Sequence, residues 1–388
     1  MFEKEVSRKG SGSYKWDTTV TDGAIERGAY PLSVADMEFR TPVEIRETIK
    51  DFAENGFFCY TDSDSVYRDS VRNFLKRRHD FNIANDWITC VGGVVFAINT
   101  AIRAFTNKGD KVIIQSPVYY PFRNSIENND RVVADNPLVI KDNSYEMNFE
   151  ELKTIASQED VKLMLLCSPH NPVGRVWTEQ ELQKVGDICL RNNVVLLSDE
   201  IHFDIIRKGQ AHTVINNVDS RFASNTVICT AVSKSFNLAG LGTSNIIIAD
   251  ENLRAIFQKQ LSADGYSCIN CVSRPATITA YTKCDYWLDA VNSYVDANIE
   301  LVKKTVSKIP QIKMYECQGT YLVWLDMSGL GMSDDELDLF LRNKCGIIQD
   351  PGFWFGETGK GFTRLNVACP NKILADCMRN LSNAIKNL

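Results

Sequence analysis

Five continuous apolar runs in the middle of the chain constrain its fold more than any other feature. Each run has the length of a β-strand, is rich in Val, Ile and Leu, and lacks the polar alternation of a strand with one wet face. Such runs are typical of parallel strands buried on both faces of a sheet. The runs are KVIIQ (111–115), VKLMLL (161–166), NVVLLS (193–198), TVICT (226–230) and NIIIA (245–249).

Helix-like segments separate these runs. The segment TEQELQKVGDICLRN (178–192) opens on Thr178 and carries Glu181 three residues later, which is the pattern of a capping box. Alternating strands and helices predict an α/β fold with right-handed crossovers. We therefore expect a large domain with a mostly parallel central sheet over residues 45–285.

The pattern changes after residue 285. A long helix-like stretch (286–309) is followed by an alternating strand GTYLVWLDM, a helix SDDELDLFLRNK and a glycine- and aromatic-rich loop PGFWFGETGKG. A strand FTRLNVACP and a last helix complete the chain. Because 388 residues exceed what one core usually serves, we expect a smaller α+β domain formed by residues 1–44 and 286–388.

The composition excludes several classes of function. A net charge of −6 argues against a nucleic-acid partner, because phosphate binding needs a basic surface. No apolar stretch is long enough to span a bilayer, and MFEKEVSRKG at the start is followed by no apolar signal segment. The twelve cysteines stand mostly in apolar contexts, as reduced cysteines do. We expect a cytoplasmic protein with no membrane partner.

The sequence carries little that resembles a metal site. Cys268 and Cys271 form a single CxxC, which alone suits a redox pair or half of a zinc site. No second CxxC accompanies it, and the four histidines lack metal-site spacing. We expect no metal ion.

Polar side chains follow four successive runs. The segments after them contain, in order, SPVYYP with Tyr119, CSPHNPVGR with Asn171, SDEIH with Asp199 and His202, and AVSK with Lys234. Ligands of open α/β sheets bind beyond the carboxyl ends of the strands. We therefore expect an aromatic ring, an amide, an acid with a histidine, and a lysine to meet at one edge of the sheet.

A phosphate cradle is predicted upstream of these segments. Gly92 and Gly93 stand where a helix begins, and glycines there expose backbone N–H groups to an anion. One ligand uses the whole set: pyridoxal 5'-phosphate (PLP). PLP needs a lysine for a covalent link, an acid at its ring nitrogen, donors to its phenolic oxygen, a flat group over its ring and a cradle for its phosphate.

At these residues the chain also resembles a known family over essentially its whole length. It resembles the fold-type I, aspartate-aminotransferase-like PLP enzymes, and within them the branch of cystathionine β-lyases and cysteine-S-conjugate β-lyases. The shared motifs are SVADMEF (33–39), SPHNPVGRVW (168–177), SDEIHFD (198–204), SKSFNLAGL (233–241) and RLNVACP (364–370).

The resemblance implies roles for the residues at the strand ends. Lys234 would bind the cofactor covalently and later move the substrate's Cα proton. Asp199 would face the ring nitrogen and keep it protonated. His202 and Asn171 would hydrogen-bond the phenolic oxygen, and Tyr119 would stack on the ring.

The resemblance also implies a phosphate site, a substrate site and a dimer. Gly93 and Val94 would offer backbone N–H groups to the phosphate, and Ser233 a hydroxyl. Tyr60 resembles a tyrosine that reaches the phosphate from a partner subunit, which implies a homodimer with shared active sites. Arg364 would bind the carboxylate of a small amino-acid substrate bidentately, as a planar guanidinium does well.

One departure from the wider family concerns the phosphate. Many aminotransferases carry an arginine eight residues after the lysine, whereas this chain has Gly242 there. The β-lyase branch tolerates this change. The walls of the pocket are expected to include the GFWFG loop (352–356) and Tyr321.

The resemblance favours a PLP-dependent C–S β-lyase that cleaves L-cystathionine or related cysteine S-conjugates to a thiol, pyruvate and ammonia. An amino-acid aminotransferase is the alternative, because both reactions begin with loss of the Cα proton. A regulatory binding protein that kept the fold is the second alternative. A nicotinamide dehydrogenase is disfavoured, because GLGTSN lacks the third glycine of the dinucleotide-binding motif and precedes a strand.

Overall fold

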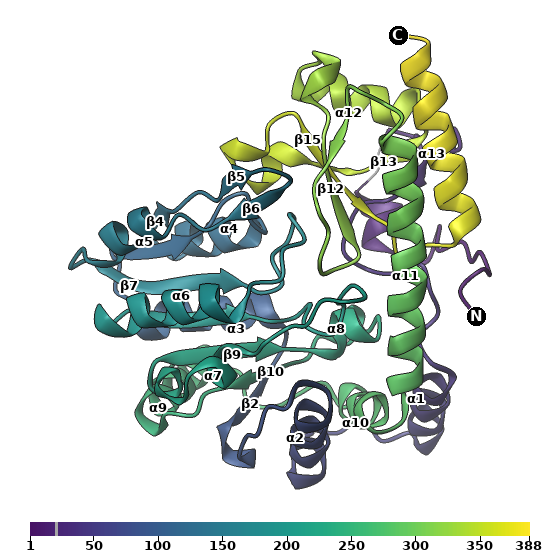
Figure 1. Ribbon diagram of the computed structural model, residues 1–388. Coiled ribbons are helices and arrows are strands. Elements are labelled where there is room, and N and C mark those ends of the chain that lie inside the picture. Colours follow the sequence, from purple (N-terminus) through teal and green to yellow (C-terminus); the bar gives the residue numbers. More distant parts are fainter. Residues whose placement is uncertain (20–21) are drawn as a thin grey trace.

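A seven-stranded sheet forms the centre of the protein, which we describe from a computed structural model covering residues 1–19 and 22–388 (Figure 1). Six strands run in one direction, and β10 is antiparallel to both of its neighbours. The strands, in spatial order, are β2 (Ile88–Val91), β10 (Ser244–Ile247), β9 (Thr226–Thr230), β8 (Val195–Asp199), β7 (Val161–Cys167), β3 (Lys111–Ile114) and β4 (Val132–Asp135).

All five apolar runs of the sequence are strands of this sheet, which confirms the predicted α/β class. The parallel direction expected for the fifth run is wrong. Between β9 and β10 the chain carries only the one-turn helices α8 (Val232–Ser235) and η4 (Ala239–Leu241). A parallel strand needs a longer crossover connection, so β10 returns antiparallel.

Burial on both faces explains why the runs show no polar alternation. In β7, Leu163 and Leu165 belong to one apolar cluster, whereas Met164 and Leu166 belong to another, and all four are buried. Successive side chains of a strand point to opposite faces, so each face needs its own apolar cover. Helices supply that cover: α3 (Val94–Phe105), α4 (Pro121–Asn128), α5 (Phe149–Ala156), α6 (Glu179–Arg191), α7 (Ile215–Val218) and α9 (Glu251–Ala263). The capping box predicted for the start of α6 is present, with Thr178 and Glu181 bonded reciprocally.

A second sheet of four antiparallel strands lies toward the C-terminus (Figure 1). Its strands, in order, are β11 (Lys313–Met314), β12 (Leu322–Asp326), β15 (Phe362–Asn366) and β14 (Asp350–Pro351). The helices of this region are α11 (Asp285–Val306), α12 (Asp334–Asn343) and α13 (Asn371–Lys386). Strand β1 (Tyr30–Pro31) pairs in parallel with β13 (Ile347–Ile348), so the N-terminal segment lies beside the C-terminal region. The domain boundaries at residues 45 and 285 stay predictions.

The remaining elements complete the outer surface. Helices α1 (Val43–Asn55), α2 (Ser65–His79) and α10 (Ser273–Lys283) pack together near the lower end of α11 (Figure 1). Strands β5 (Val139–Lys141) and β6 (Ser144–Glu146) form a hairpin.

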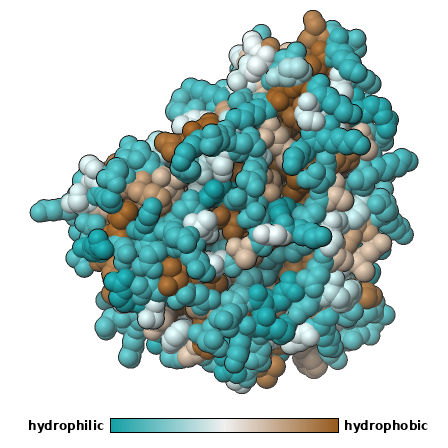
Figure 2. Space-filling model, in the orientation of Figure 1, coloured by the Kyte–Doolittle hydropathy of each residue, from teal (hydrophilic) through white to brown (hydrophobic). Residues whose placement is uncertain are grey.

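Figure 2 shows that one face of the molecule is mainly hydrophilic, with scattered apolar patches. In the part of the chain that the structure describes, no helix has the length and apolar character needed to cross a membrane.

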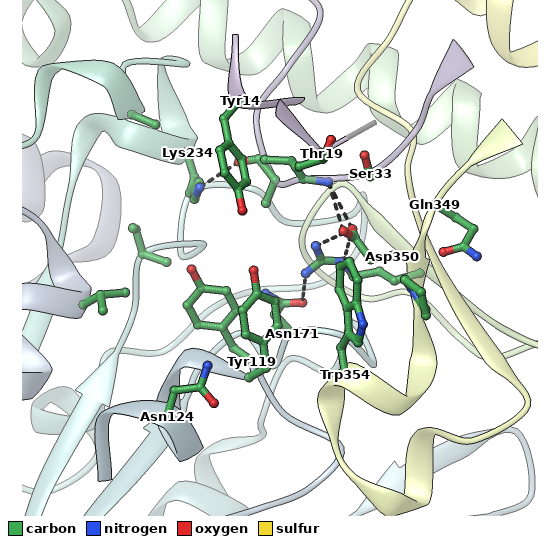
Figure 3. Close-up of a pocket in the computed structure, with 18 of the residues that line it drawn as sticks. Tyr14, Thr19, Ser33, Tyr119, Asn124, Asn171, Lys234, Gln349, Asp350 and Trp354 are labelled. Atoms are coloured by element: carbon green, nitrogen blue, oxygen red, sulfur yellow. Dashed lines mark hydrogen bonds and ion pairs between the residues drawn. The ribbon is translucent and has the colours of Figure 1, made fainter. Parts of the chain in front are cut away.

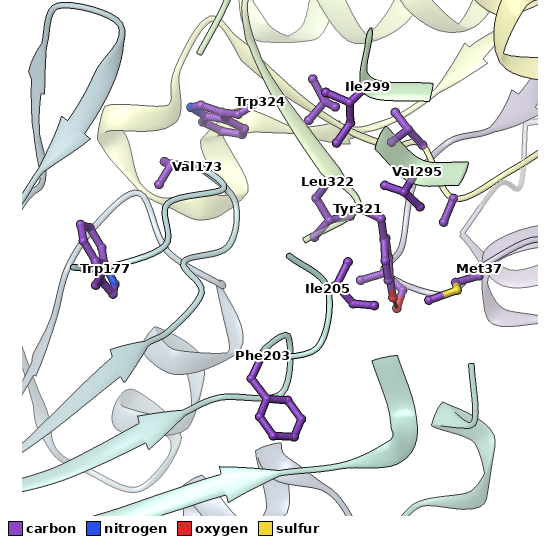
Figure 4. Close-up of a cluster of buried hydrophobic side chains, with 14 of the residues drawn as sticks. Met37, Val173, Trp177, Phe203, Ile205, Val295, Ile299, Tyr321, Leu322 and Trp324 are labelled. Atoms are coloured by element: carbon purple, nitrogen blue, oxygen red, sulfur yellow. Dashed lines mark hydrogen bonds between the residues drawn. The ribbon is translucent and has the colours of Figure 1, made fainter. Parts of the chain in front are cut away.

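The two sheets are joined by a shared apolar cluster (Figure 4). Leu322 of β12, Ile205 of the segment after β8 and Val295 of α11 all belong to it and are buried. Tyr321 is also fully buried, and its hydroxyl donates to the Ala35 carbonyl at 2.8 Å. This cluster fixes the C-terminal sheet against the carboxyl ends of the central strands, where the predicted site residues lie.

Candidate active site

A cavity of about 760 Å³ opens at the carboxyl ends of β7, β8 and β9, between the two sheets (Figure 3). Its walls come from both sheets and from the N-terminal segment. Nine of the ten site residues predicted from the sequence line it: Gly93, Val94, Tyr119, Asn171, Asp199, His202, Ser233, Lys234 and Arg364. Residues more than 270 positions apart in the sequence therefore meet in one cavity.

Tyr60 is the exception. It lies on the loop between α1 and α2, its side chain is almost fully exposed, and it lines a different, shallow depression with Cys271 and Arg274. The single chain does not bring Tyr60 to the cavity.

Lys234 occupies the one-turn helix α8, directly after β9. Its Nζ donates to the carbonyl oxygen of Ala35 at 2.7 Å. Burial lowers the pKa of Lys234 to about 8, because a charged amine loses hydration there, and nearby Asp36 only partly opposes this. A substantial fraction of the amine is therefore neutral just above neutral pH, as a nucleophile or a proton acceptor requires.

Asp199 ends β8, the strand next to β9. Burial raises the pKa of Asp199 to about 7, although the Ile201 N–H donates to its Oδ1 at 3.2 Å and Lys234 favours the ionised form. A carboxyl group in such a position is stabilised as an anion when it meets a protonated ring nitrogen.

His202 is buried three residues after Asp199. Burial lowers the pKa of His202 well below its usual value, and the positive charges of Lys234 and Arg364 act in the same direction. The imidazole is therefore neutral at pH 7. Its Nδ1 is buried and has no hydrogen-bond partner among the described residues. Because buried polar atoms are normally paired, this orphaned nitrogen fits a polar ligand atom in the cavity.

The predicted phosphate cradle lies at the start of α3. Gly93 has φ of 130°, which favours glycine, and it is the N-cap residue of a helix whose first residue is Val94. No atom lies within 4 Å of the place where a Cβ would stand on Gly93. This open backbone next to a helix N-terminus suits an anion. Gly242, which replaces the arginine of many aminotransferases, has a left-handed φ of 55°.

Arg364 lies on β15 and is only 2% exposed. Its Nε and Nη2 donate to Oδ2 of Asp350 at 3.1 and 2.5 Å, and its Nη1 donates to Oδ1 of Asn171 at 2.8 Å. The guanidinium thus reaches from the C-terminal sheet to the strand-end loop of the central sheet. It supplies the only positive charge, besides Lys234, that the sequence predicts in the site.

The adjacent aromatic residues Tyr119 and Tyr120 both line the cavity but differ in their neighbours. The Tyr119 N–H donates to the Asn171 carbonyl at 3.0 Å, which fixes the start of this segment. Tyr120 packs edge-on against Trp354, with ring centroids 6.0 Å apart. The GFWFG loop contributes Trp354 to the wall, as predicted, whereas Tyr321 lies buried behind Ala35 and does not line the cavity.

Two groups of site residues were missed by the sequence analysis. The first is the turn at Ser33, Val34 and Ala35, which was noted only as part of a shared motif. The second is Asp350, which pairs with Arg364. No spacing in the sequence indicates that residues 350 and 364 face each other across two strands.

The remaining candidate residues of the sequence lie outside this cavity. Cys268 and Cys271 are free thiols, partly exposed and outside the cavity. Among the described residues, no group of histidine, cysteine and carboxylate side chains has the arrangement of a metal site.

Comparison with known proteins identifies the family. Residues 28–378 match the family described as aminotransferase class I and II. The chain is 40% identical to cystathionine beta-lyase PatB of Bacillus subtilis over 99% of both chains. The crystal structure of cystalysin from Treponema denticola, described as containing a pyridoxal 5'-phosphate cofactor, superposes with a TM-score of 0.95 at 39% identity over 100% of this chain and 99% of that one. A PLP-bound C–S lyase from Staphylococcus hominis gives a TM-score of 0.92 at 28% identity over the full length of both chains.

The chain therefore belongs to the aminotransferase class I and II family, and the resemblance found in its sequence motifs is confirmed. The cavity fits the cofactor named for the similar structures. It holds a buried lysine of lowered pKa, a buried acid, a neutral histidine with an orphaned nitrogen, and an open glycine at a helix start.

The lowered pKa of Lys234 predicts its reactivity in the cofactor-free protein. An amine reacts with acetic anhydride only when neutral, and an ordinary lysine has a pKa of about 10.4. Because the folded pKa of Lys234 is about 8, its acetylation rate should rise with a midpoint near pH 8. Mass spectrometry of digested samples labelled across a pH series measures this. Exposed lysines of the same sample are the control, and a midpoint for Lys234 equal to theirs would contradict the electrostatic description.

Proposed function

We propose that this protein is a PLP-dependent C–S β-lyase that cleaves L-cystathionine or a related cysteine S-conjugate to a thiol, pyruvate and ammonia. The observation that carries the proposal is the convergence of Lys234, Asp199 and Arg364 on one cavity. The similarity to proteins named cystathionine beta-lyase and C–S lyase selects this reaction among those of the family.

Five side chains would hold the cofactor. Lys234 would carry it covalently, and Asp199 would pair with its ring nitrogen. His202 and Asn171 would donate to its phenolic oxygen, and Tyr119 would cover its ring. When bound, PLP supplies an electron sink for the pair released at the substrate's Cα.

The phosphate of the cofactor would meet backbone and hydroxyl donors. Gly93 and Val94 would offer N–H groups at the start of α3, and Ser233 would offer its hydroxyl. Because Gly242 adds no charge here, the helix N-terminus would carry more of the anion stabilisation than in relatives with an arginine.

The chain's own groups account for binding and proton transfer. Arg364 would bind the α-carboxylate of the amino acid, which places Cα near Lys234. The amino group of the substrate would first replace Lys234 in its covalent link to the cofactor, which frees the lysine amine. The freed, neutral amine would take the Cα proton, and the thiolate would then leave Cβ with the electron pair of the C–S bond. Water releases the remaining three-carbon fragment as pyruvate and ammonia. A lysine pKa of about 8 suits both the acceptance and the return of a proton near neutral pH.

The reaction is tested by incubating the purified PLP-loaded protein with L-cystathionine and no keto acid. We expect equal amounts of pyruvate and homocysteine over many turnovers, and loss of at least about a thousandfold of kcat in Lys234→Ala, because the proton acceptor is gone. Lys372→Ala is the matched control and should keep full activity, because Lys372 is exposed and does not line the cavity.

Turnover that appears only when a keto acid is supplied would instead identify an aminotransferase. Retention of the cellular phenotype in Lys234→Ala would favour the regulatory binding protein. Either result would contradict the proposed function.

The proposal includes a homodimer with shared active sites. Tyr60 is 97% exposed, and Phe57 and Phe58 of the same loop are 75% and 63% exposed. Three exposed aromatic side chains on one short loop are typical of a surface that a partner covers. A second copy of the chain would bury this loop. Tyr60 of each subunit would then reach the cofactor phosphate in the cavity of the other subunit.

The dimer predicts a specific effect of the Tyr60 hydroxyl. Light scattering should give twice the chain mass, and Tyr60→Phe should weaken PLP binding by roughly tenfold, the loss of one hydrogen bond to a charged group. Tyr286→Phe is the matched control, because Tyr286 is a half-exposed tyrosine whose hydroxyl donates to the Glu44 carboxylate. A fully active monomer, or equal PLP affinity in both variants, would contradict the shared site.

The proposed enzyme acts in the cytoplasm. All twelve cysteines are free thiols, and eight of them are buried in apolar surroundings. Thiols persist in this form in a reducing compartment.

A further inference from the structure

The guanidinium of Arg364 has a counter-ion that no sequence motif indicates. Asp350 of β14 stands directly opposite Arg364 of β15 in the antiparallel register. Both residues are buried, at 3% and 2% exposure. Oδ2 of Asp350 accepts from Nε at 3.1 Å and from Nη2 at 2.5 Å, so the carboxylate holds one edge of the planar guanidinium (Figure 3).

The hydrogen bonds of Arg364 to Asp350 and Asn171 leave two of its N–H groups available to a ligand. A guanidinium has five N–H groups, of which two go to Asp350 and one goes from Nη1 to Asn171. One N–H therefore remains on each of Nη1 and Nη2. Two N–H groups on neighbouring nitrogens are what a bidentate carboxylate takes.

Asp350 is itself fixed from a second direction. The Val34 N–H donates to its two carboxylate oxygens at 3.3 and 3.1 Å. Val34 has a left-handed φ of 53°, an unfavourable conformation for a β-branched residue that persists only where neighbours hold it. The next residue, Ala35, accepts the hydrogen bond of Lys234. Asp350 thus lies between the carboxylate-binding arginine and the turn that contacts the lysine.

We propose that Asp350 is a positioning residue for substrate: it orients Arg364 so that the two remaining N–H groups receive the α-carboxylate of an amino acid. This inference rests on the proposed function, because it takes the ligand to be an amino acid. The substrate does not displace Asp350, because strand register holds the two residues opposite each other and the Val34 N–H holds the carboxylate. The site therefore selects amino acids over amines that lack the carboxylate.

The test is binding of two probes to the PLP-loaded enzyme, read from the cofactor's absorption spectrum. L-Alanine carries the α-carboxylate, and ethylamine is the same molecule without it. We expect Asp350→Asn to raise the Kd of L-alanine by roughly tenfold, as loss of a charge-assisted contact does, and to leave the Kd of ethylamine within about twofold. With L-cystathionine, KM should rise more than kcat falls.

Asp338→Asn is the matched control. Asp338 also lines the cavity and pairs with an arginine, Arg342, at 2.7 Å, but the structure gives it no contact with Arg364. It should leave the preference for L-alanine over ethylamine unchanged. Asp350→Glu keeps the buried charge and moves it by one methylene, so it should give a smaller loss of that preference even if Asp350→Asn folds poorly.

Equal weakening of both probes would mean that Asp350 serves stability alone, and unchanged or tighter L-alanine binding would mean that it does not orient Arg364. Either result overturns the inference. L-Alanine has no leaving group at Cβ, so β-elimination cannot consume it. The absorbance change is read immediately after mixing, before any transamination can alter the cofactor, so binding reports on Asp350 even if the enzyme proves to be an aminotransferase. A failure of the proposed reaction would appear separately, as the absence of pyruvate from L-cystathionine in the unaltered enzyme.

Discussion

The site depends on the burial of the Lys234 amine, which removes it from water and favours the neutral, reactive form. Burial favours its neutral form, and the Ala35 carbonyl accepts its hydrogen bond. Asp199 lies at the end of the neighbouring strand, where burial raises its pKa toward neutrality. Burial thus moves both pKa values toward neutrality. The amine can then accept a proton near physiological pH, and Asp199 would be held as an anion once it meets a protonated ring nitrogen.

The turn at residues 33–37 connects the region around Lys234 and Asp199 to the four-stranded C-terminal sheet. Asn366 donates from Nδ2 to the carbonyls of Val34 and Asp36, at 2.7 Å each. Asn237, in the loop after Lys234, accepts from the Met37 N–H at 2.9 Å and returns a bond to the Met37 carbonyl. Contacts from both sheets therefore hold the unfavourable φ of Val34, and they place the Ala35 carbonyl at the lysine. Strained backbone of this kind is concentrated at functional sites.

The sequence predicts the central sheet well because burial on both faces leaves a strong local signal, the continuous apolar run. Strand order also predicts part of the cavity, because the carboxyl ends of parallel strands meet at one edge; the residues found in this way are Tyr119, Asn171, Asp199, His202 and Lys234. Gly93 is expected from its place at a helix start. Val94, Ser233 and Arg364 are expected only from the family resemblance. Other features depend on contacts between distant segments. The direction of β10, the pairing of Asp350 with Arg364 and the burial of Tyr321 behind Ala35 follow from connection length, strand register and packing, which no local pattern encodes. Tyr60 lies outside the cavity in the single chain, and its predicted contribution requires the homodimer proposed above.

The central claim is that Lys234 is the lysine that binds the cofactor covalently. Reduction of the PLP-loaded protein with borohydride makes the bond between the cofactor and its lysine permanent, and mass spectrometry of the digested protein locates the adduct. The account predicts one pyridoxyl group per chain, on the peptide that contains Lys234. An adduct on any other lysine, or none at all, would contradict it.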